Sequence, residues 1–363
     1  MNPVTKNLRI PAVYGALFAL LVSAQAQTPS NEATKELPPV TLEAFNVSAT
    51  RSDSYQADSV QMGAFRDINP VDVPLTINVL PREVIEAQSA RGLFDTLKNT
   101  AGVSRSQITG AAYDNLAIRG ITIENRGNYR LNGSLPIINL ADISLENKER
   151  VEVLKGTSSL YYGFIPPSGV INLVTKRALA ESLTAITVNA NSAGGAGGSI
   201  DLSRRYGPGN NFGLRMNLSS SWEQTGLDRF GGRRSFESLA ADWHPIKQLM
   251  IRADFEHLDK NVTEQSAITL PTAVAGVITP PPLTPNTRNL GADWTRYDAR
   301  MTNWWTRVDY IISSQWTVFA EAGNARTHRN RLYAPFTFGA PQATTTGQPA
   351  GPPWHRVFST YLL

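Results

Sequence analysis

The chain has 363 residues, with 34 Lys and Arg against 30 Asp and Glu, four His and no Cys. Without Cys it can form neither a disulfide framework nor a thiolate zinc site, and the four His residues have no ligand spacing. The net charge of +4 is not carried by any run of Lys or Arg. Nucleic-acid binding is therefore a poor interpretation.

The amino terminus predicts a cleaved secretory signal peptide over residues 1–26. Lys6 and Arg9 precede an apolar stretch, residues 10–22, which closes with the small-residue site at 24–26. This stretch is shorter than the ~20 apolar residues that a membrane-spanning helix needs. We therefore expect the mature chain to begin in the periplasm.

A flexible leader is expected over residues 27–51. Residues 27–39 are mostly Thr, Pro, Ser, Asn and Glu, which bury too little apolar surface to offset the entropy of ordering. The segment that follows, residues 40–51, has Phe45 and Val47 on one side of an extended chain. Such a peptide can add a strand to the sheet edge of a partner, or it can be the first strand of the next domain.

Residues 52–180 predict one mixed α+β domain. We expect a short strand over Val73 to Val79 and a helix that Pro81 opens, because the missing N–H of proline costs nothing at the first helical position. A second helix is expected within Ala90 to Thr100, with Gly102 as its stop.

The most specific signal is residues 150–177, RVEVLKGTSSLYYGFIPPSGVINLVTKR. Two β-branched runs, 151–154 and 170–175, flank a Gly/Pro-rich connection, which predicts a strand, loop, strand unit. Taken alone, this pattern also fits an ordinary hairpin of a soluble domain.

After Arg177 the sequence changes to an alternation of apolar and polar residues, with aromatic residues near the ends of the runs. Clear examples are residues 212–219, 249–256 and 307–313. The pattern is typical of a transmembrane barrel wall around a polar lumen. A soluble β-sandwich also buries one face of each strand, so alternation alone does not separate the two.

Connection lengths favour the barrel, because short and long links alternate as they do in outer-membrane barrels. The short links are 207–210, 244–247 and 313–314, and the long ones are 223–234, 261–297 and 327–353. Eight strands are predicted near residues 183–192, 196–206, 211–222, 235–243, 248–258, 299–312, 315–325 and 354–363.

Several of these segments together resemble the plug domain of the TonB-dependent outer-membrane receptors. They are residues 74–104, PLTINVLPREVIEAQSARGLFDTLKNTAGVS, the motif LAIRG at 116–120, and residues 150–177. The spacing of these motifs is most similar to the ferric-siderophore branch of that family. The resemblance implies an α+β plug domain followed by antiparallel transmembrane β-barrel strands, about eight of an expected 22 over residues 181–363.

The resemblance also assigns functions to particular residues. Those similar to the TonB box, which binds TonB, are Leu42, Glu43, Ala44, Phe45, Asn46, Val47, Ser48 and Ala49. Those expected at the substrate-binding plug apex are Arg105, Gln107, Tyr113, Arg126, Asn128 and Tyr129. Those expected to pair with one another and with carboxylates of the barrel wall are Arg119, Arg150, Glu152 and Lys155.

The implied mechanism is binding without bond chemistry, so no catalytic residue, metal ligand or directly bound cofactor is expected, and iron is carried within the substrate. The implied partners are TonB with its inner-membrane energising complex, a ferric siderophore, outer-membrane lipid and the barrel-assembly machinery. The implied location is the outer membrane of a Gram-negative bacterium. Cationic and aromatic apex residues suit an anionic, aromatic iron chelate.

The chain departs from the family in length. An eight-stranded barrel has room only for its own side chains and cannot also enclose a plug, and an open sheet edge leaves backbone groups unsatisfied in lipid. The sequence therefore predicts an amino-terminal part of a receptor, which does not transport if it is made alone. The alternatives are a non-transporting remnant, a plug-like binding module, or a receptor for another substrate such as cobalamin or glycans.

Overall fold

The structure is a computed structural model that describes residues 55–62, 65–106, 112–156, 159–163, 165–265, 267–269, 277, 285, 287–333, 335–337 and 355–362. The predicted signal peptide, the leader and the proposed TonB box lie outside these residues.

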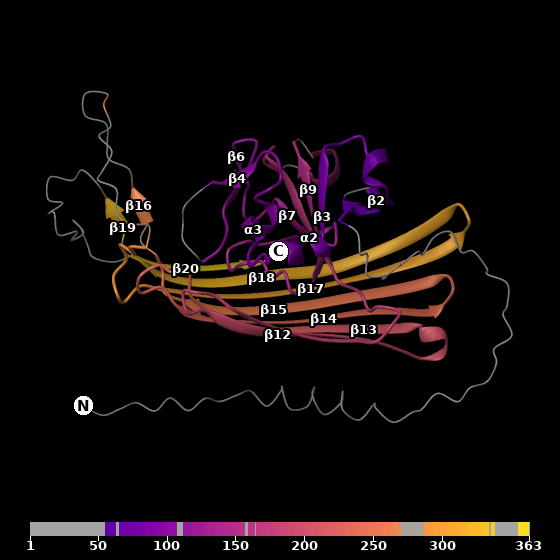
Figure 1. The fold of residues 1–363 in the computed structure, drawn as a ribbon. Helices are drawn as coiled ribbons and strands as arrows, with labels where there is room; N and C mark the ends of the chain where they lie inside the picture. Colours follow the sequence, from indigo (N-terminus) through magenta and orange to yellow (C-terminus); the bar gives the residue numbers. More distant parts are fainter. Residues whose placement is uncertain are drawn as a thin grey trace. The chain divides into compact units, whose positions relative to one another are not determined.

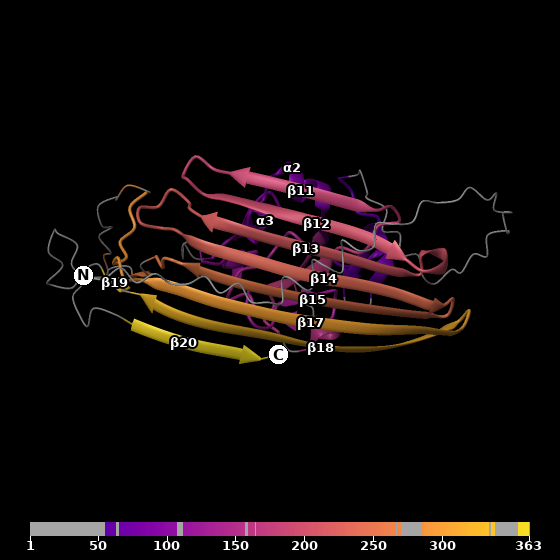
Figure 2. The same ribbon diagram turned by 90° about the horizontal axis from the view of Figure 1, so that it is seen from below.

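Most of the second half of the chain forms one eight-stranded antiparallel sheet, whose strands lie side by side nearly in chain order (Figure 2). The strands are β11 (Leu183–Ala190), β12 (Ala196–Tyr206), β13 (Phe212–Glu223), β14 (Gly232–Ile246), β15 (Leu249–Val262), β17 (Arg296–Ser313), β18 (Trp316–Tyr333) and β20 (His355–Leu362). Among the described residues β11 and β20 are the two edges, so this sheet is open. The eight predicted strands are confirmed.

Several of these strands are longer than the sequence pattern predicted. β17 and β18 each have 18 residues: β17 begins at Arg296, where residue 299 was expected, and β18 ends at Tyr333, where residue 325 was expected. The alternation of apolar residues fades before the hydrogen-bonded ladder ends, because the ends of the strands are polar. Apolar periodicity therefore marks the middle of a strand better than its ends.

The links that join the strands differ in length between the two ends of the strands. Short links follow β12, β14 and β17 at residues 207–211, 247–248 and 314–315, and we call this side the turn edge. Links of 224–231 and 263–295 follow β13 and β15, and we call this side the loop edge. A short two-stranded parallel sheet at the loop edge joins the link after β15 to the link after β18 (Figure 1). Its strands are β16 (Ala267–Thr269) and β19 (Pro335–Thr337).

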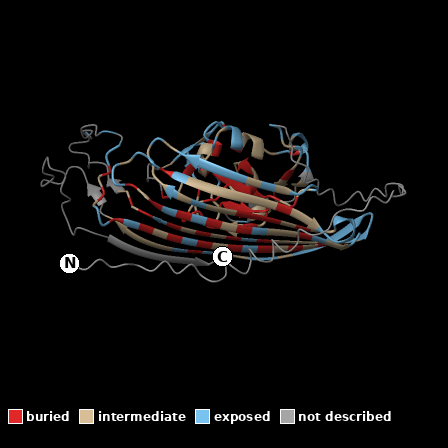
Figure 3. Ribbon diagram, turned by 60° about the horizontal axis from the view of Figure 1, so that its bottom comes forward, coloured by how far each residue is buried: buried red, intermediate tan, exposed pale blue. Residues whose placement is uncertain are grey.

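The convex face of the sheet carries exposed apolar and aromatic side chains, and the opposite face carries buried polar ones. Figure 3 shows the resulting alternation of buried and exposed residues along the strands. Exposed outward residues include Ile186, Val188, Trp222, Trp243, Phe255, Trp304, Tyr310, Ile312 and Trp316. Such an outward apolar surface is typical of a barrel wall that faces lipid. In the described residues, no helix has the length and apolar character to span a bilayer.

Residues 60–177, which we call the plug domain, are built around a five-stranded sheet in the order β3-β9-β10-β7-β8. The strands are β3 (Ile77–Pro81), β9 (Lys148–Lys155), β10 (Gly169–Thr175), β7 (Tyr129–Leu131) and β8 (Leu135–Ile137). β9 and β10 pair antiparallel, as residues 150–177 predicted, whereas β10 and β7 pair in parallel. All seven residues of β10 are buried, which explains its continuous β-branched run.

Shorter elements complete the plug domain. They are β1 (Val60–Met62), β2 (Phe65–Ile68), a 3₁₀ turn (Pro70–Asp72), α2 (Arg82–Ala87), α3 (Leu93–Leu97), β4 (Val103–Arg105), β5 (Leu116–Ile118), β6 (Ile121–Thr122) and α4 (Ser159–Tyr162). The expected helix after Pro81 begins one residue later, because Pro81 ends β3 and serves as the N-cap. The strand predicted over 73–79 lies at 77–81 instead.

The apolar core of the plug domain extends into the sheet. Leu97, Leu116 and Val151 belong to the same buried cluster as Trp305 and Ala325, which lie on β17 and β18. The indole Nε1 of Trp305 donates to Ser134 Oγ at 3.0 Å. The plug domain therefore packs directly against the face of the sheet that carries the polar side chains, which we call the inner face.

Candidate docking and binding site

Four carboxylates on the inner face of the sheet accept charged hydrogen bonds from the plug domain. The pairs are Lys176–Asp201 at 2.7 Å, Arg177–Asp254 at 2.6 Å, Lys148–Glu256 at 2.5 Å and Arg66–Glu321 at 3.1 Å. We call the four carboxylates the acidic wall row. Their positions alternate along the strands with the outward apolar residues, so the pleat of the sheet directs them inward.

Asp254 is held by three plug residues at once. Asn132 Nδ2 and Thr175 Oγ1 each donate to it at 3.0 Å, and Arg177 Nη2 donates at 2.6 Å. A buried carboxylate is stable only when it is paired and hydrogen-bonded, and the plug domain supplies both requirements. Separating plug and sheet would therefore expose or orphan this charge.

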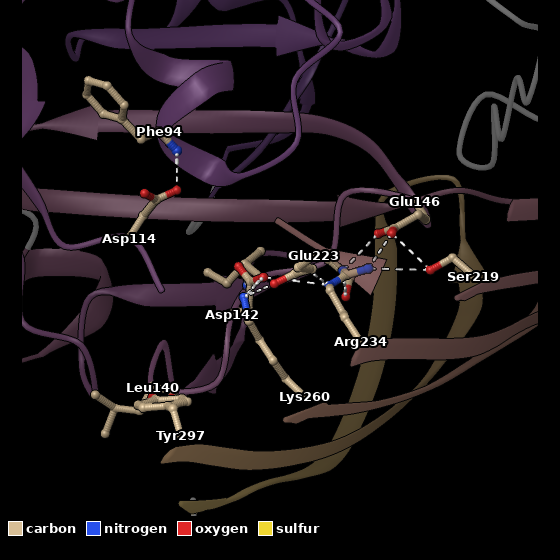
Figure 4. A network of polar contacts seen from close by, with 12 residues as sticks. Phe94, Asp114, Leu140, Asp142, Glu146, Ser219, Glu223, Arg234, Lys260 and Tyr297 are labelled. Carbon is tan, nitrogen blue, oxygen red and sulfur yellow. Dashed lines mark hydrogen bonds and ion pairs between the residues drawn. The ribbon is translucent and has the colours of Figure 1, made fainter. Parts of the chain in front are cut away.

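The polarity of the contacts reverses toward the loop edge. There the sheet supplies the cations Arg234 and Lys260, and the plug domain supplies the carboxylates (Figure 4). Arg234 Nη1 donates to Glu146 Oε1 at 2.6 Å, and Lys260 Nζ donates to Asp142 Oδ2 at 3.1 Å. At the acidic wall row the plug domain is cationic and the sheet is anionic, whereas near the loop edge the signs are reversed. This complementarity fixes the orientation of the plug domain.

The pKa of Glu146 reflects this environment. Burial by itself raises the pKa of this carboxyl, but the charge of Arg234 and hydrogen bonds from Arg234 and Ser219 outweigh burial and hold the pKa at about 2. Glu146 is therefore ionised throughout the physiological range and holds Arg234 as a charged pair.

The plug residues that make these loop-edge contacts lie in residues 138–147, which we call the strap. The strap has no regular secondary structure, yet Ala141, Ser144 and most of its other residues are buried. Tyr297 Oη donates to the carbonyl of Leu140, and Asp142 has φ = 134°, a value that favours glycine. A non-glycine residue in such a conformation persists only where surrounding contacts determine it, and here the ion pairs with the sheet do so.

Arg105 and Tyr113, two of the predicted apex residues, lie close together at the loop-edge side of the plug domain. The guanidinium of Arg105 lies 4.4 Å from the ring centroid of Phe94 and donates to Asp114 Oδ1 at 3.2 Å, while half of the side chain stays exposed. Asp114 also accepts from the backbone N–H of Phe94 at 2.8 Å (Figure 4), and burial raises its pKa. Tyr113 packs 6.0 Å from Tyr297 between ring centroids.

The other predicted apex residues are placed differently. Arg126 is exposed in the link after β6, and Gln107 lies outside the described residues. Asn128 and Tyr129 are fully buried, because β7 pairs with β10 inside the plug sheet. Asn128 Nδ2 donates to the carbonyl of Gly169 at 2.6 Å. In this structure these two residues belong to the plug core, and their role in substrate binding stays a prediction.

The four residues expected to hold the plug against the barrel make their described hydrogen bonds and ion pairs within the plug domain. Arg150 Nε donates to Glu152 Oε1 at 2.8 Å, and Lys155 Nζ donates to the carbonyl of Ala101 at 2.6 Å. Arg119 is exposed and lies beside Gly156. Arg150, Glu152 and Lys155 lie on β9, and of this strand Lys148 at its start pairs with a carboxylate of the wall.

The residues that do join plug and sheet were not predicted as partners. On the plug side they include Arg66, Asn132, Asp142, Glu146, Lys148, Lys176 and Arg177. The available signal was the charge on inward positions of the alternating strands, where Asp254 and Glu256 alternate with Ala253 and Phe255. Within the described residues, no group of three or more His, Cys, Asp or Glu side chains is arranged to hold a metal ion.

Comparison with known proteins identifies the amino-terminal fold. Residues 69–170 match the TonB-dependent receptor plug domain. The chain is 28% identical over 301 residues to a ferrichrome receptor of Yersinia enterocolitica, covering 81% of this chain and 38% of that protein. It is 32% identical over 224 residues to a probable TonB-dependent receptor of Bordetella pertussis, covering 60% of this chain and 27% of that protein. The chain thus spans about two fifths or less of these curated relatives.

Solved structures show the same architecture. The ferric preacinetobactin receptor from Acinetobacter baumannii matches with a TM-score of 0.71 at 25% identity, over 78% of this chain and 43% of that one. The closed form of a ferric-catecholate import receptor from Escherichia coli K12 matches with a TM-score of 0.68 at 20% identity, over 85% of this chain and 44% of that one. The expected plug domain followed by antiparallel barrel strands is confirmed.

Proposed function

We propose, from the premise that this chain combines the plug domain of the TonB-dependent receptors with eight of their barrel strands, that it serves in the uptake of ferric siderophores across the outer membrane. Substrate binds at the plug apex, and TonB then pulls the plug away from the wall. The relatives named above are receptors for iron chelates or probable TonB-dependent receptors, which supports a receptor rather than an enzyme.

The observation that carries the proposal is the chemistry of the plug–sheet surface. A permanently buried domain interface would be mostly apolar, whereas this one is crossed by charged pairs at Asp201, Asp254, Glu256, Arg234 and Glu321. Water can replace a polar partner when the surfaces separate, so a polar interface can open into an aqueous lumen at lower cost than an apolar one.

The residues expected at the apex support the proposed substrate class. Arg105 is oriented by Phe94 and Asp114 and remains half exposed, so its free N–H groups can bind an anion. Arg126 adds a second exposed cation, and Tyr113 adds an aromatic ring. We propose an anionic ferric chelate as the substrate, with iron carried inside the chelate and no cofactor bound by the chain itself.

Energy for release is proposed to come from TonB. Its binding segment would be the box at residues 42–49, which precedes β1 and lies outside the described residues. β1 is tied to the plug core through Gln61, whose N–H donates to Glu152 Oε1 at 2.9 Å and whose carbonyl accepts from Asn172 Nδ2 at 2.9 Å. A pull on the box would therefore load the plug sheet directly.

The test is radioiron uptake in a Gram-negative host that lacks its own ferric-siderophore receptors and expresses the complete receptor of which we propose this chain to be the amino-terminal part. Ferrichrome, a catecholate complex and ferric pyoverdine are supplied in turn, with and without TonB. Binding of one complex, with uptake that needs TonB, supports the proposal. Failure to bind any of them would contradict it and favour the alternatives, which are a non-transporting plug-bearing protein or a receptor for a different substrate.

A further inference from the structure

Arg234 and Lys260 are direct cross-strand partners on β14 and β15. Both side chains point to the inner face and are almost fully buried, at 8% and 3% exposure. Like charges directly opposite in an antiparallel pair repel, and burial strengthens the repulsion. Such a pair is stable only with anionic groups placed between or beside the two cations.

The anionic groups come mainly from the strap. Glu146 and Asp142 pair with the two cations at 2.6 and 3.1 Å, and Ser144 Oγ accepts from Arg234 Nη2 at 2.7 Å. The sheet itself supplies one carboxylate, Glu223, which lies 3.0 Å from Lys260 Nζ and 4.0 Å from Arg234 Nε. Figure 4 shows these carboxylates gathered around the two cationic side chains.

The three strap residues lie within five positions of one another in the chain, so a movement of the strap would remove them together. Of the carboxylates described around Arg234 and Lys260, the wall would then keep Glu223, which leaves a local excess of positive charge. A guanidinium and an ammonium side by side can bind several oxygen atoms of one anion. The carboxylates of the strap occupy the positions that such oxygens would take.

We infer that Arg234 and Lys260 form a second anion-binding site, covered by the strap in this structure, which takes the oxygen atoms of an anionic substrate once the strap withdraws. This inference rests on the proposed function, because it assigns the substrate a resting place on the wall between the apex and the turn edge. The strap carboxylates act as stand-ins that keep the site closed until then.

The site can be tested without TonB or siderophore by emptying it. In the full chain, purified in detergent, the double variant Asp142→Gly with Glu146→Ala removes both strap carboxylates, and glycine suits the backbone at position 142. Inorganic phosphate is the probe, with chloride at equal ionic strength as the reference. At about ten times Kd, phosphate is expected to raise the melting temperature of the double variant by about 3 °C and to leave the unmodified chain unchanged.

Two further variants locate the effect. Adding Arg234→Gln to the double variant should abolish the response to phosphate. The matched control, Lys148→Ala, removes a plug side chain that faces a wall carboxylate, Glu256, and not a wall cation. Its melting temperature should not respond to phosphate. If the double variant does not fold, Glu146→Ala alone is measured in the same way, with a smaller expected shift.

A melting temperature that does not respond to phosphate in either emptied variant would overturn the inference, as would an equal response in the presence of Arg234→Gln. Neither result bears on the proposed function, which needs only that the plug can leave the wall. Conversely, a failure of iron uptake in the unmodified protein would leave a phosphate response at Arg234 and Lys260 standing as a binding property of the wall.

Discussion

Lys148 Nζ and Glu256 Oε2 lie 2.5 Å apart where the plug domain meets the sheet, and both side chains are at most 2% exposed. Asn147 and Asn303 donate to the same carboxylate at 3.0 and 2.8 Å. The charge of Glu256 is thus compensated from the plug and from the wall at once. The contact is strong while the plug is docked. When the plug leaves, Asn303 of the wall still donates to Glu256.

Removing one partner of this pair should be costly. Lys148→Ala leaves the buried carboxylate of Glu256 without its cation, and we expect a loss of about 3–5 kcal/mol in stability. Denaturant unfolding monitored by hydrogen exchange of β9 would measure it. Adding Glu256→Gln to Lys148→Ala should recover much of the loss, and an unchanged loss in the double variant would contradict the electrostatic explanation.

Arg66 should matter less, although it also pairs with the acidic wall row. Glu321 accepts from Arg66 at 3.1 Å and from Arg307 at 2.5 Å, so Arg66→Ala leaves the carboxylate with a cation. We expect a loss of about 1 kcal/mol, well below that of Lys148→Ala. The same unfolding experiment compares Arg66→Ala with Lys148→Ala. Equal losses of stability would show that the second cation, Arg307, does not compensate the charge of Glu321.

The plug–wall contact at Glu146 should weaken in acid. Its pKa is held at about 2, below the ordinary value of 4.5, so the folded state binds fewer protons than the unfolded state between these values. The stabilisation is fully present above about pH 4.5 and is lost as the pH falls toward 2. As the pH is lowered from 6 to 2, the melting temperature should therefore fall less steeply for Glu146→Gln than for the unmodified chain. Parallel curves would show that Glu146 does not cause the loss of stability in acid.

Gly169 opens β10 with φ = 131°, and a Cβ there would lie 2.1 Å from the carbonyl oxygen of Leu154. Gly169→Ala must therefore distort the β9–β10 pairing, and we expect a loss well above 1 kcal/mol. Gly163 is the matched control, since its φ is 71° but a Cβ there meets nothing within 4 Å. Thermal unfolding of both variants should separate the steric effect from the backbone preference, and equal losses would rule out the clash.

The sequence predicted those parts of the fold that depend on local pattern. Alternation in residues 249–256 placed Asp254 and Glu256 on the charged face, and the structure confirms that they face inward. Their partners could not be read in the same way, because Arg177 and Lys148 are 77 and 108 residues distant along the chain. Only the docking of the plug domain brings them together.

The apex shows what a local pattern leaves out. Asn128 and Tyr129 were predicted as substrate contacts because they lie in the expected link 124–132, which offers cationic and aromatic groups, and the structure places both in the plug core. The parallel pairing of β7 with β10 buries them, and a parallel partner some forty residues away leaves no mark in the local sequence. Arg105 lies at the end of β4, and its side chain is half exposed.

The central claim is that transport requires the plug to leave the wall, and the absence of Cys from the sequence allows a direct measurement. Cysteines replacing Glu146 on the strap and Ser219 on β13, whose side chains are hydrogen-bonded at 2.9 Å, can be joined by a short bifunctional thiol reagent. Cells carrying the complete receptor with this joined pair should bind the ferric siderophore at the normal level but take up no iron, whereas the complete receptor with either single Cys, treated with the same reagent, should still transport. Uptake at the same rate in the joined protein would contradict the account.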